Sequence, residues 1–292
     1  MLNGTGDVGP GARPAILGIL NASPESISGN RFDAGTVAEA AERLVADGAD
    51  VLDIGAQSLR TDQPELPVDD EIDRLLPVLA AVRERLPSVA ISVDTYRHEV
   101  AAAAAGYGID LINDPSGLHD EGLCEVVGQH GLSLVLAHNP GAPKVRRPAD
   151  HRPPDPVGGC REFLAERLDR IVANGVPREQ VILDPGPDLY KAPDHTIAVL
   201  RAVPALRREL GVARVLWAVS RKDFVGALLD APPSGRGAGT LGALAALPIE
   251  DGDLVRVHDV RSTAEFFTVQ RALLHGHEGE LRLAEHLRYD PS

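Results

Sequence analysis

Eight short apolar runs, each ending in a polar residue or glycine, recur along this sequence of 292 residues. Segments with helical character separate them, so strands and helices alternate. The expected strands cover residues 16–21, 51–55, 90–95, 111–115, 134–139, 181–186, 215–220 and 254–260. This alternation is typical of parallel strands joined by crossover helices, and eight such units predict a closed (β/α)8 TIM barrel of the α/β class.

The segments between the strands carry helical signals of different kinds. Residues 34–48 place apolar side chains at the helical spacing and end in glycine. Residues 69–86 begin with acidic and end with basic side chains, as the helix dipole favours. Residues 96–108 are rich in alanine, and residues 159–176 and 262–276 are amphipathic. An open, doubly wound sheet is the alternative fold, although no G-x-G-x-x-G motif follows the first strand.

No composition shift marks a domain boundary inside the barrel region. We expect a flexible N-terminal segment at residues 1–14, one barrel over residues 15–278, and a tail or helix extension at residues 279–292. Two stretches rich in proline, glycine and arginine, residues 139–159 and 230–239, are expected as long loops after the fifth and seventh strands.

Charge and cysteine content narrow the class of protein. Its 29 basic and 43 acidic residues give a net charge of −14, which disfavours nucleic acid or an anionic membrane surface as a partner. Cys124 and Cys160 are the only cysteines, too few for a disulfide framework or a zinc cluster. The first residues show no signal-peptide pattern, and no apolar run approaches the roughly 20 residues of a membrane span. We therefore expect a cytoplasmic protein.

Polar residues gather at the expected strand ends, where TIM barrels build their active sites. They are Asn21, Asp94, Asn113, His138, Asp184, Ser220, Arg221, Lys222, Arg256 and His258. The carboxylates and the amide suit the edge of a polar heterocycle, and the cations suit phosphate. Each aspartate alone is commonly a turn former or helix cap, and the lone histidine a packed side chain. Together they predict a site for a planar ring joined to an anionic group.

Several stretches of the chain resemble the dihydropteroate synthase family of pterin-binding barrels. The matching stretches are ILGILNASPESIS, GADVLDIGAQSLR, ISVDTYRHEVA, DLINDPSG, VLAHN, VILDPG, AVSRKDFVG, GTLGALAA and VRVHDV. They occur in the family's order, from about residue 15 to residue 275. The resemblance implies a TIM-barrel transferase that uses Mg²⁺ and forms a homodimer through helices away from the barrel mouth.

The resemblance also implies site residues. The pterin would be bound by Asp94, Asn113, Asp184, Lys222 and Arg256. The diphosphate would be bound by Asn21, Arg60, Arg256 and His258, with Asn21 also holding the metal. The acceptor pocket would be lined by Ile27, Leu59, Thr61, Leu189, Tyr190 and Ser220. The catalytic roles would fall to Asp94, which stabilises charge on the pterin, to Lys222, and to Arg60, which closes over the leaving group.

In the family reaction, 6-hydroxymethyl-7,8-dihydropterin diphosphate loses diphosphate and p-aminobenzoate attacks the resulting pterin cation. Such an enzyme needs little covalent chemistry, because it works by positioning and by electrostatic stabilisation. Mg²⁺ is consistent with this chemistry, since diphosphate oxygens supply most of its ligands. The expected partners are therefore two small molecules, a pterin diphosphate and an aryl amine.

The chain departs from the family pattern mainly around the second substrate. In the first loop, N-V-T-P-D-S-F becomes a segment with Glu25 and Ile27 at the aspartate and phenylalanine positions. In the second loop, S-T-R-P becomes residues 58–61, Ser-Leu-Arg-Thr. After the sixth strand, I-G-F-G-K becomes residues 187–191, Pro-Asp-Leu-Tyr-Lys, and Ala137 replaces a methionine. These changes predict a reshaped acceptor pocket beside an intact pterin site.

Four functions remain open at this stage. The chain is a synthase with low affinity for sulfonamide mimics, a synthase for a different amine, a pterin-binding paralogue with little turnover, or a folate-dependent methyltransferase. Losing one threonine hydroxyl contact costs about 1 kcal/mol, which alone does not abolish an enzyme, so we prefer the synthase. Arg60 and His258 argue against the methyltransferase, because a methyl donor carries no diphosphate.

Overall fold

The computed structural model confirms the (β/α)8 barrel. It describes residues 13–22, 34–57, 61, 63–148, 151–277 and 279–288. Eight parallel strands pair in chain order, and β8 pairs back with β1 to close the barrel. The strands are β1 (Ala15–Asn21), β2 (Val51–Gly55), β3 (Ala90–Asp94), β4 (Leu111–Asp114), β5 (Ser133–Ala137), β6 (Val181–Asp184), β7 (Arg214–Trp217) and β8 (Leu254–Val257).

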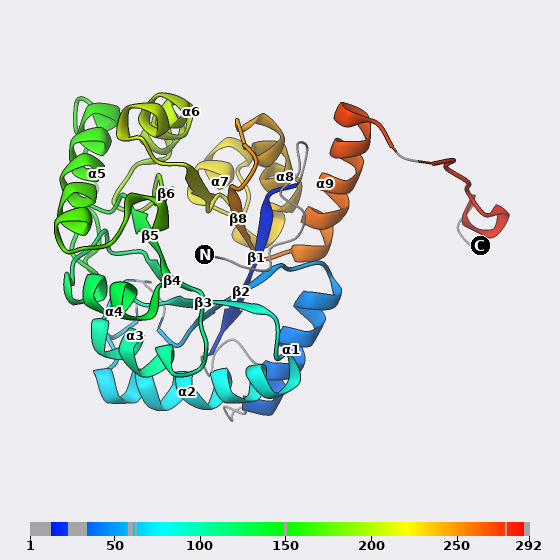
Figure 1. Cartoon of the computed structure of the whole chain (residues 1–292). Helices are drawn as coiled ribbons and strands as arrows, with labels where there is room; N and C mark the ends of the chain where they lie inside the picture. The colour runs from blue at the N-terminus through cyan, green and yellow to red at the C-terminus, as the bar shows by residue number, and fades with distance from the viewer. Residues whose placement is uncertain are drawn as a thin grey trace.

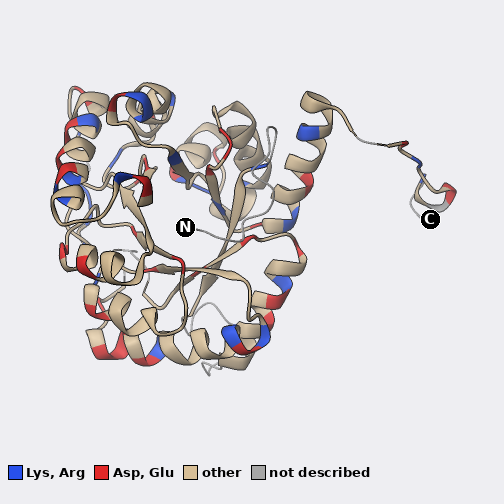
Figure 2. Cartoon of the chain, viewed as in Figure 1, with Lys and Arg blue, Asp and Glu red and all other residues tan. Residues whose placement is uncertain are grey.

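The helices surround this barrel, and charged residues lie both on the helices and on the loops between the elements (Figures 1 and 2). They are α1 (Ala34–Ala46), α2 (Val68–Arg85), α3 (His98–Ala105), α4 (Gly122–His130), α5 (Pro156–Ala173), α6 (Pro193–Leu210), α7 (Asp223–Leu229), α8 (Gly237–Ala246) and α9 (Val260–His275). Two helices, α7 and α8, lie between β7 and β8, whereas the other connections described use one. The helices expected from the sequence agree with the structure to within a few residues.

Strand residues point alternately into the barrel and toward the helices. The inward residues of the lower barrel form an apolar floor of Leu17, Val51, Leu111, Val135, Ile182, Leu216 and Leu254. The outward residues pack beneath the helices in a second, larger aliphatic cluster. Farther along the strands the inward positions become polar, at Asp53, Ser92, Asn113 and Arg256. The polar residues therefore lie above a packed hydrophobic layer.

Several expected strands run one to three residues beyond the real strand ends. The run 134–139 ends as a strand at Ala137, and the run 254–260 ends at Val257. In the second case α9 starts at once, because Oδ1 of Asp259 accepts the backbone N–H of Ser262 at 3.0 Å and caps the helix. The polar ends of these runs thus belong to the βα loops.

A buried aspartate ties the lower ends of β7 and β8 to α6. Asp253 is fully buried, and its carboxylate accepts hydrogen bonds from both terminal nitrogens of Arg207, at 3.2 and 2.9 Å. It also accepts the indole N–H of Trp217 and the backbone N–H of Val215, both at 2.9 Å. Because every lone pair is used, this buried charge is stabilised by its surroundings.

The last described residues of the chain leave the barrel (Figure 1). Of the expected N-terminal segment, residues 1–12 lie outside the described residues. At the other end, residues 279–288 extend away from the barrel and include a short 3-10 helix, Glu285–Leu287 (Figure 1). None of the helices in the described part of the chain is long and apolar enough to cross a membrane.

Candidate functional site

A partly buried ion-pair cluster lies in the upper interior of the barrel. Nε of Arg256 donates to Oδ2 of Asp53 at 2.6 Å, and its Nη2 donates to Oδ2 of Asp94 at 2.7 Å. The amide nitrogen of Asn113 lies 3.2 and 3.3 Å from the two carboxylate oxygens of Asp53. The Ser92 hydroxyl donates to the same carboxylate at 2.6 Å. These contacts fix the orientation of one guanidinium between two carboxylates at the barrel mouth.

Asp53 is the charged residue of this cluster that was not predicted from the sequence. It lies in the middle of β2, whereas the residues predicted for the barrel mouth were those at strand ends. A signal was present, because an acid inside an otherwise apolar, fully buried strand is costly unless it has a partner. The side chain is 1 % exposed, and the residues that neutralise or hydrogen-bond it are on β3, β4 and β8.

The Asp94 carboxyl group is poised between its two protonation states at neutral pH. Burial raises its pKa to about 7, although the adjacent Arg256 acts in the opposite direction. The negative charge of Asp53 contributes to the increase. A ligand that develops positive charge against this carboxyl group would favour the ionised form.

Asp184 serves as both a turn former and a candidate site residue. It ends β6 beside Ala137 of β5, and its Oδ1 accepts the backbone N–H of Gly186 at 2.7 Å. Burial raises the pKa of Asp184, while that hydrogen bond and the positive charge of Lys222 act in the opposite direction. The Asp-Pro-Gly turn foreseen from the sequence is therefore present, and its carboxylate remains within the electrostatic reach of Lys222.

Ser220 and His258 form a hydrogen-bonded pair at the ends of β7 and β8. The Ser220 hydroxyl lies 2.9 Å from Nδ1 of His258 and accepts the backbone N–H of His258 at 3.2 Å. Burial and the charges of Arg221, Arg256 and Lys222 lower the pKa of His258 to about 4. The three cations around this neutral imidazole make the position suitable for an anion. A bound anion would in turn favour protonation of His258. Ser220, predicted for the acceptor pocket, thus lies against the residue predicted for diphosphate.

The predicted residues of the first two loops are only partly placed. Asn21 is exposed at the end of β1, next to Gly55 of β2. Its amide oxygen is of the ligand type that Mg²⁺ prefers. Ile27, Leu59 and Arg60 lie outside the described residues, so their roles stay predictions.

A cavity of about 660 Å³ opens between the loop after β5 and the turn after β6. Its wall includes three residues predicted for the acceptor pocket, Thr61, Leu189 and Tyr190. Asp223, directly after Lys222, also lines it. The structure therefore brings half of the predicted acceptor residues into one hollow, whose lining residue Asp223 follows Lys222 of the predicted pterin site in the chain.

The turn after β6 keeps a glycine-like backbone without its glycines. Asp188 and Tyr190 occupy the two positions where the family pattern has glycine, and they have φ angles of 64° and 54°. Such left-handed conformations favour glycine. The Tyr190 ring packs so closely on Gly141 that a Cβ there would lie 2.2 Å from it. It also meets the ring of His151 edge to face, with centroids 4.7 Å apart. The tyrosine is thus held rigidly in the cavity wall.

Lys191 is a second residue to which the sequence analysis gave no role. It is buried, and its Nζ donates to the carbonyl oxygens of His138 and Gly186, both at 2.8 Å, and of Leu189 at 3.1 Å. Burial lowers its pKa to about 8. The lysine connects the loop after β5 to the turn after β6. No pattern predicted this, because lysine is rarely buried.

His138 itself is a packed side chain. It is 5 % exposed, and its ring meets Phe163 edge to face with centroids 5.2 Å apart. Burial lowers its pKa to about 2. This placement agrees with the interpretation of a packed histidine at that strand end.

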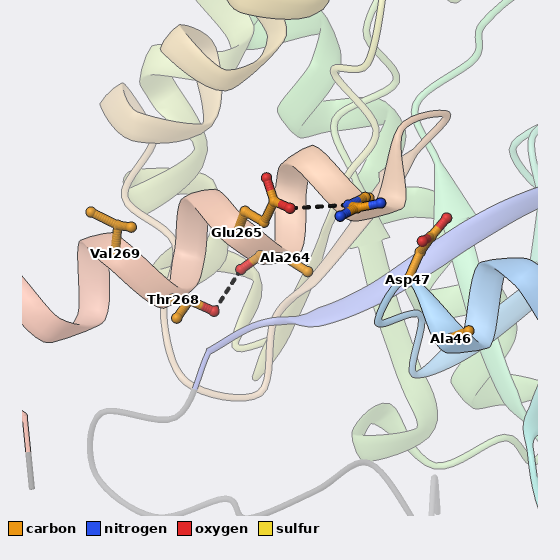
Figure 3. Close-up of a pocket in the computed structure, with 7 residues that line it drawn as sticks. Ala46, Asp47, Ala264, Glu265, Thr268 and Val269 are labelled. Carbon is orange, nitrogen blue, oxygen red and sulfur yellow. Dashed lines mark hydrogen bonds and ion pairs between the residues drawn. The ribbon is translucent and has the colours of Figure 1, made fainter. Parts of the chain in front are cut away.

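A separate hollow of about 520 Å³ lies on the outside of the barrel, between α1 and α9 (Figure 3). It is lined by Ala46, Asp47, Arg261, Ala264, Glu265, Thr268 and Val269. Its two charged α9 residues pair with each other, at 3.1 Å between Nε of Arg261 and Oε1 of Glu265. None of the predicted site residues lines this hollow, which distinguishes it from the barrel mouth.

The chain resembles known proteins over almost its whole length. Residues 17–258 match a family model described as pterin binding enzyme. The dihydropteroate synthase of Synechocystis is 38% identical over 269 residues, which cover 90% of this chain and 91% of that protein. The dihydropteroate synthase of Bacillus subtilis is 36% identical, with coverage of 89% and 88%.

The fold of the chain is also similar to solved structures of dihydropteroate synthases. The dihydropteroate synthase of Xanthomonas albilineans with 4-aminobenzoic acid superposes with a TM-score of 0.82 at 33% identity, covering 91% of this chain and 94% of that one. The same enzyme in complex with 7,8-dihydropteroate gives 0.78 at 32% identity, covering 91% and 95%. The Yersinia pestis enzyme with a sulfonamide drug complex gives 0.80 at 32% identity, covering 89% and 94%.

Proposed function

The chain belongs to the dihydropteroate synthase family of pterin-binding transferases, and from this premise we propose the reaction and roles below. The enzyme condenses 6-hydroxymethyl-7,8-dihydropterin diphosphate with p-aminobenzoate or a related aryl amine and releases diphosphate. The observation that carries the proposal is the placement of Arg256 between Asp53 and Asp94, beside Asn113. It presents a guanidinium, a carboxyl group and an amide to one planar, hydrogen-bonding ligand.

Asp94 stabilises the transition state. The C–O bond to the diphosphate breaks, the diphosphate leaves with the bonding electron pair, and positive charge develops on the pterin. An ionised Asp94, partly buried at the barrel mouth, stabilises that charge most strongly as it forms. The aryl amine then forms the new C–N bond and loses its proton. Asn113, Asp184 and Lys222 hold the ring in place for this attack.

The leaving diphosphate is held at the opposite end of the site. His258, hydrogen-bonded to Ser220 and surrounded by cations, is placed to accept an anion as a neighbour. Asn21 and Arg60 complete this end in our proposal. When bound, Mg²⁺ would be held by the Asn21 amide oxygen and the diphosphate oxygens, where it would neutralise the leaving group.

The aryl amine occupies the cavity bounded by Thr61, Leu189 and Tyr190. Relatives of this chain bind 4-aminobenzoic acid and sulfonamide drugs. We propose that the replaced residues of the cavity wall lower the affinity for sulfonamide mimics of p-aminobenzoate in this chain.

We also propose a cytoplasmic homodimer. Its two cysteines are free and buried, which is consistent with a reducing compartment. The end of α9 exposes Val269, Leu273 and Leu274, on the outer surface away from the barrel mouth. This exposed aliphatic surface forms part of the subunit interface in our proposal. Analytical ultracentrifugation tests this point, and a monomer at micromolar concentration contradicts it.

The reaction is tested with purified protein, pterin diphosphate, p-aminobenzoate and Mg²⁺. We expect equal amounts of diphosphate and dihydropteroate, measured by coupled phosphate release and by mass spectrometry. Pterin binding without condensation would instead identify a pterin-binding paralogue. No observation on this structure favours the folate-dependent methyltransferase.

A further inference from the structure

The cavity beside the acceptor position has one strongly basic wall. Lys144, Arg146 and Arg147 line it from the loop after β5. Nη1 of Arg147 donates to the backbone carbonyls of Pro148 at 3.0 Å and His151 at 2.8 Å. Within the described ranges of the chain, neither Arg146 nor Arg147 lies at ion-pair distance from a carboxylate. Two guanidinium charges therefore remain without an acidic partner there.

The acids on the facing wall already have partners of their own. The carboxylate of Asp188 accepts the backbone N–H of Asp223 and, at 3.4 Å, the hydroxyl of Thr196. The carboxylate of Asp223 pairs with Arg236 at 2.9 Å. The described acids of this wall are thus paired within it, whereas Arg146 and Arg147 have no acidic partner among the described residues. In a chain with a net charge of −14, two such guanidinium groups in one hollow are a distinctive feature.

This asymmetry decides where an acidic group of a ligand binds. A carboxylate near Asp188 and Asp223 would meet two negative charges, one of which already caps the first backbone N–H of α7. A carboxylate on the opposite side would meet Arg146 and Arg147, whose planar guanidinium groups bind carboxylates with two parallel hydrogen bonds.

The size of the cavity allows a ligand larger than one benzoate ring. Its volume of about 660 Å³ lies within the range of about 300–1,000 Å³ that pockets for drug-sized ligands show. Leu189 and Tyr190 provide an apolar wall for an aromatic ring, and contacts with Gly141 and His151 keep the tyrosine in place. An aryl amine bound there has room to extend an acidic tail toward the basic wall.

We propose that the preferred acceptor is an aryl amine with an extended carboxylate tail, of the N-(4-aminobenzoyl) amino acid class, whose tail binds Arg146 and Arg147. This inference rests on the proposed condensation and specifies its second substrate. The chemistry of the bond-forming step is unchanged: the amine forms the C–N bond, diphosphate leaves, and the amine proton is released. The product then already carries the acidic tail.

The test compares 4-aminobenzoyl-glutamate with p-aminobenzoate as acceptors. We expect the wild-type kcat/KM to be higher for the glutamate conjugate. In the variant Arg146→Gln/Arg147→Gln, the ratio of the two kcat/KM values should fall by about tenfold or more, through KM, since each lost charge-assisted hydrogen bond weakens binding severalfold. The matched control is Arg201→Gln, an exposed arginine on α6 that does not line the cavity. An unchanged ratio in the double variant overturns the proposal.

Two further measurements keep the inference separate from the proposed reaction. Arg146→Gln alone removes a cavity charge without removing the hydrogen bonds that Arg147 makes to its loop, so it serves if the double variant does not fold. Calorimetry gives the Kd of 4-aminobenzoyl-glutamate for each variant, and so measures binding in the cavity in the absence of turnover. If the conjugate binds in a way that depends on Arg146 and Arg147 but no condensation occurs, the proposed reaction is contradicted and the proposed binding site for the tail is supported. Condensation of p-aminobenzoate with no preference for the tail supports the reaction and overturns the inference.

Discussion

Nη2 of Arg256 lies 2.7 Å from Oδ2 of Asp94, and the same guanidinium holds Asp53 through its Nε at 2.6 Å. One cation is thus shared by two carboxylates that come from neighbouring strands, β2 and β3. Burial, together with the nearby negative charge of Asp53, explains why the pKa of Asp94 is raised despite its contact with this guanidinium. The contact with Arg256 also holds the Asp94 carboxylate at the barrel mouth, where it can stabilise positive charge on a bound pterin.

Activity should therefore depend on pH near neutrality. Because burial raises the pKa of Asp94 to about 7, we expect kcat/KM to increase as the pH rises through about 7 and Asp94 ionises. A stopped assay from pH 5 to pH 9 in a constant-ionic-strength buffer measures the profile. A rate that is flat across this range would contradict the assigned role of Asp94.

The free energy of unfolding should fall as the pH rises, over a wider pH range than the increase in activity. The pKa of Asp94 is about 7 in the folded chain and near its ordinary 3.8 when unfolded, so the folded state binds more protons between these values. The contribution of this group to the free energy of unfolding is fully present below pH 3.8 and is lost as the pH rises to about 7. Asp94→Asn should remove this part of the pH dependence. Urea titrations at pH 5 and pH 7.5 for both proteins measure it.

Asp53 should act as a positioning residue. Burial is the main cause of the raised pKa of Asp94, and Asp53→Asn removes a negative charge that adds to it and frees Arg256 for Asp94 alone. We expect the acidic limb of the kcat/KM profile to move to lower pH, together with a lower kcat because the guanidinium loses its second anchor. Asp70→Asn, an exposed aspartate on α2, is the matched control. A lower kcat with an unmoved pH profile would indicate a purely structural role.

Asp188 should weaken the binding of small acidic acceptors. Asp188→Gly removes one negative charge from the cavity wall and places glycine at a φ of 64°, which relieves a cost of about 1 kcal/mol. We expect a severalfold lower KM for p-aminobenzoate and little change for its uncharged ethyl ester. An equal effect on both acceptors would show that shape, and not charge, is the reason.

Asp253 should be important for stability and not for the chemistry. Asp253→Ala leaves the buried Arg207 and the Trp217 indole N–H without their acceptor, and removal of one partner of a buried pair costs about 3–5 kcal/mol. Guanidinium unfolding monitored by tryptophan fluorescence measures the loss. Asp251→Ala, an exposed aspartate in the same loop, should change stability by less than about 0.5 kcal/mol.

The fold could be predicted because its signal is periodic. Eight apolar runs and the helices between them specify strand order and direction, so the strand-end residues Asp94, Asn113 and Asp184 were found. Asp53 was missed because it precedes its strand end, and Lys191 because its partners are backbone carbonyls that leave no trace in side-chain patterns. The left-handed backbone at Tyr190 is equally invisible without the structure.

The position of Arg146 and Arg147 in the cavity wall also could not be predicted from the sequence. The loop that carries Arg146 and Arg147 was expected from its proline, glycine and arginine content. Its approach to the turn after β6 depends on Lys191 and on the packing of Tyr190 against Gly141, two tertiary contacts between distant segments. The composition of the sequence predicted the loop, whereas its position beside the candidate site follows from tertiary packing.

The most direct test of this account compares binding and chemistry in Asp94→Asn. Calorimetry gives the Kd of the pterin diphosphate, and a single-turnover reaction with p-aminobenzoate gives the rate of the chemical step. If Asp94 stabilises charge that exists only in the transition state, the rate should fall by about a thousandfold while the Kd changes by less than about tenfold. Equal losses in binding and in rate would contradict the account.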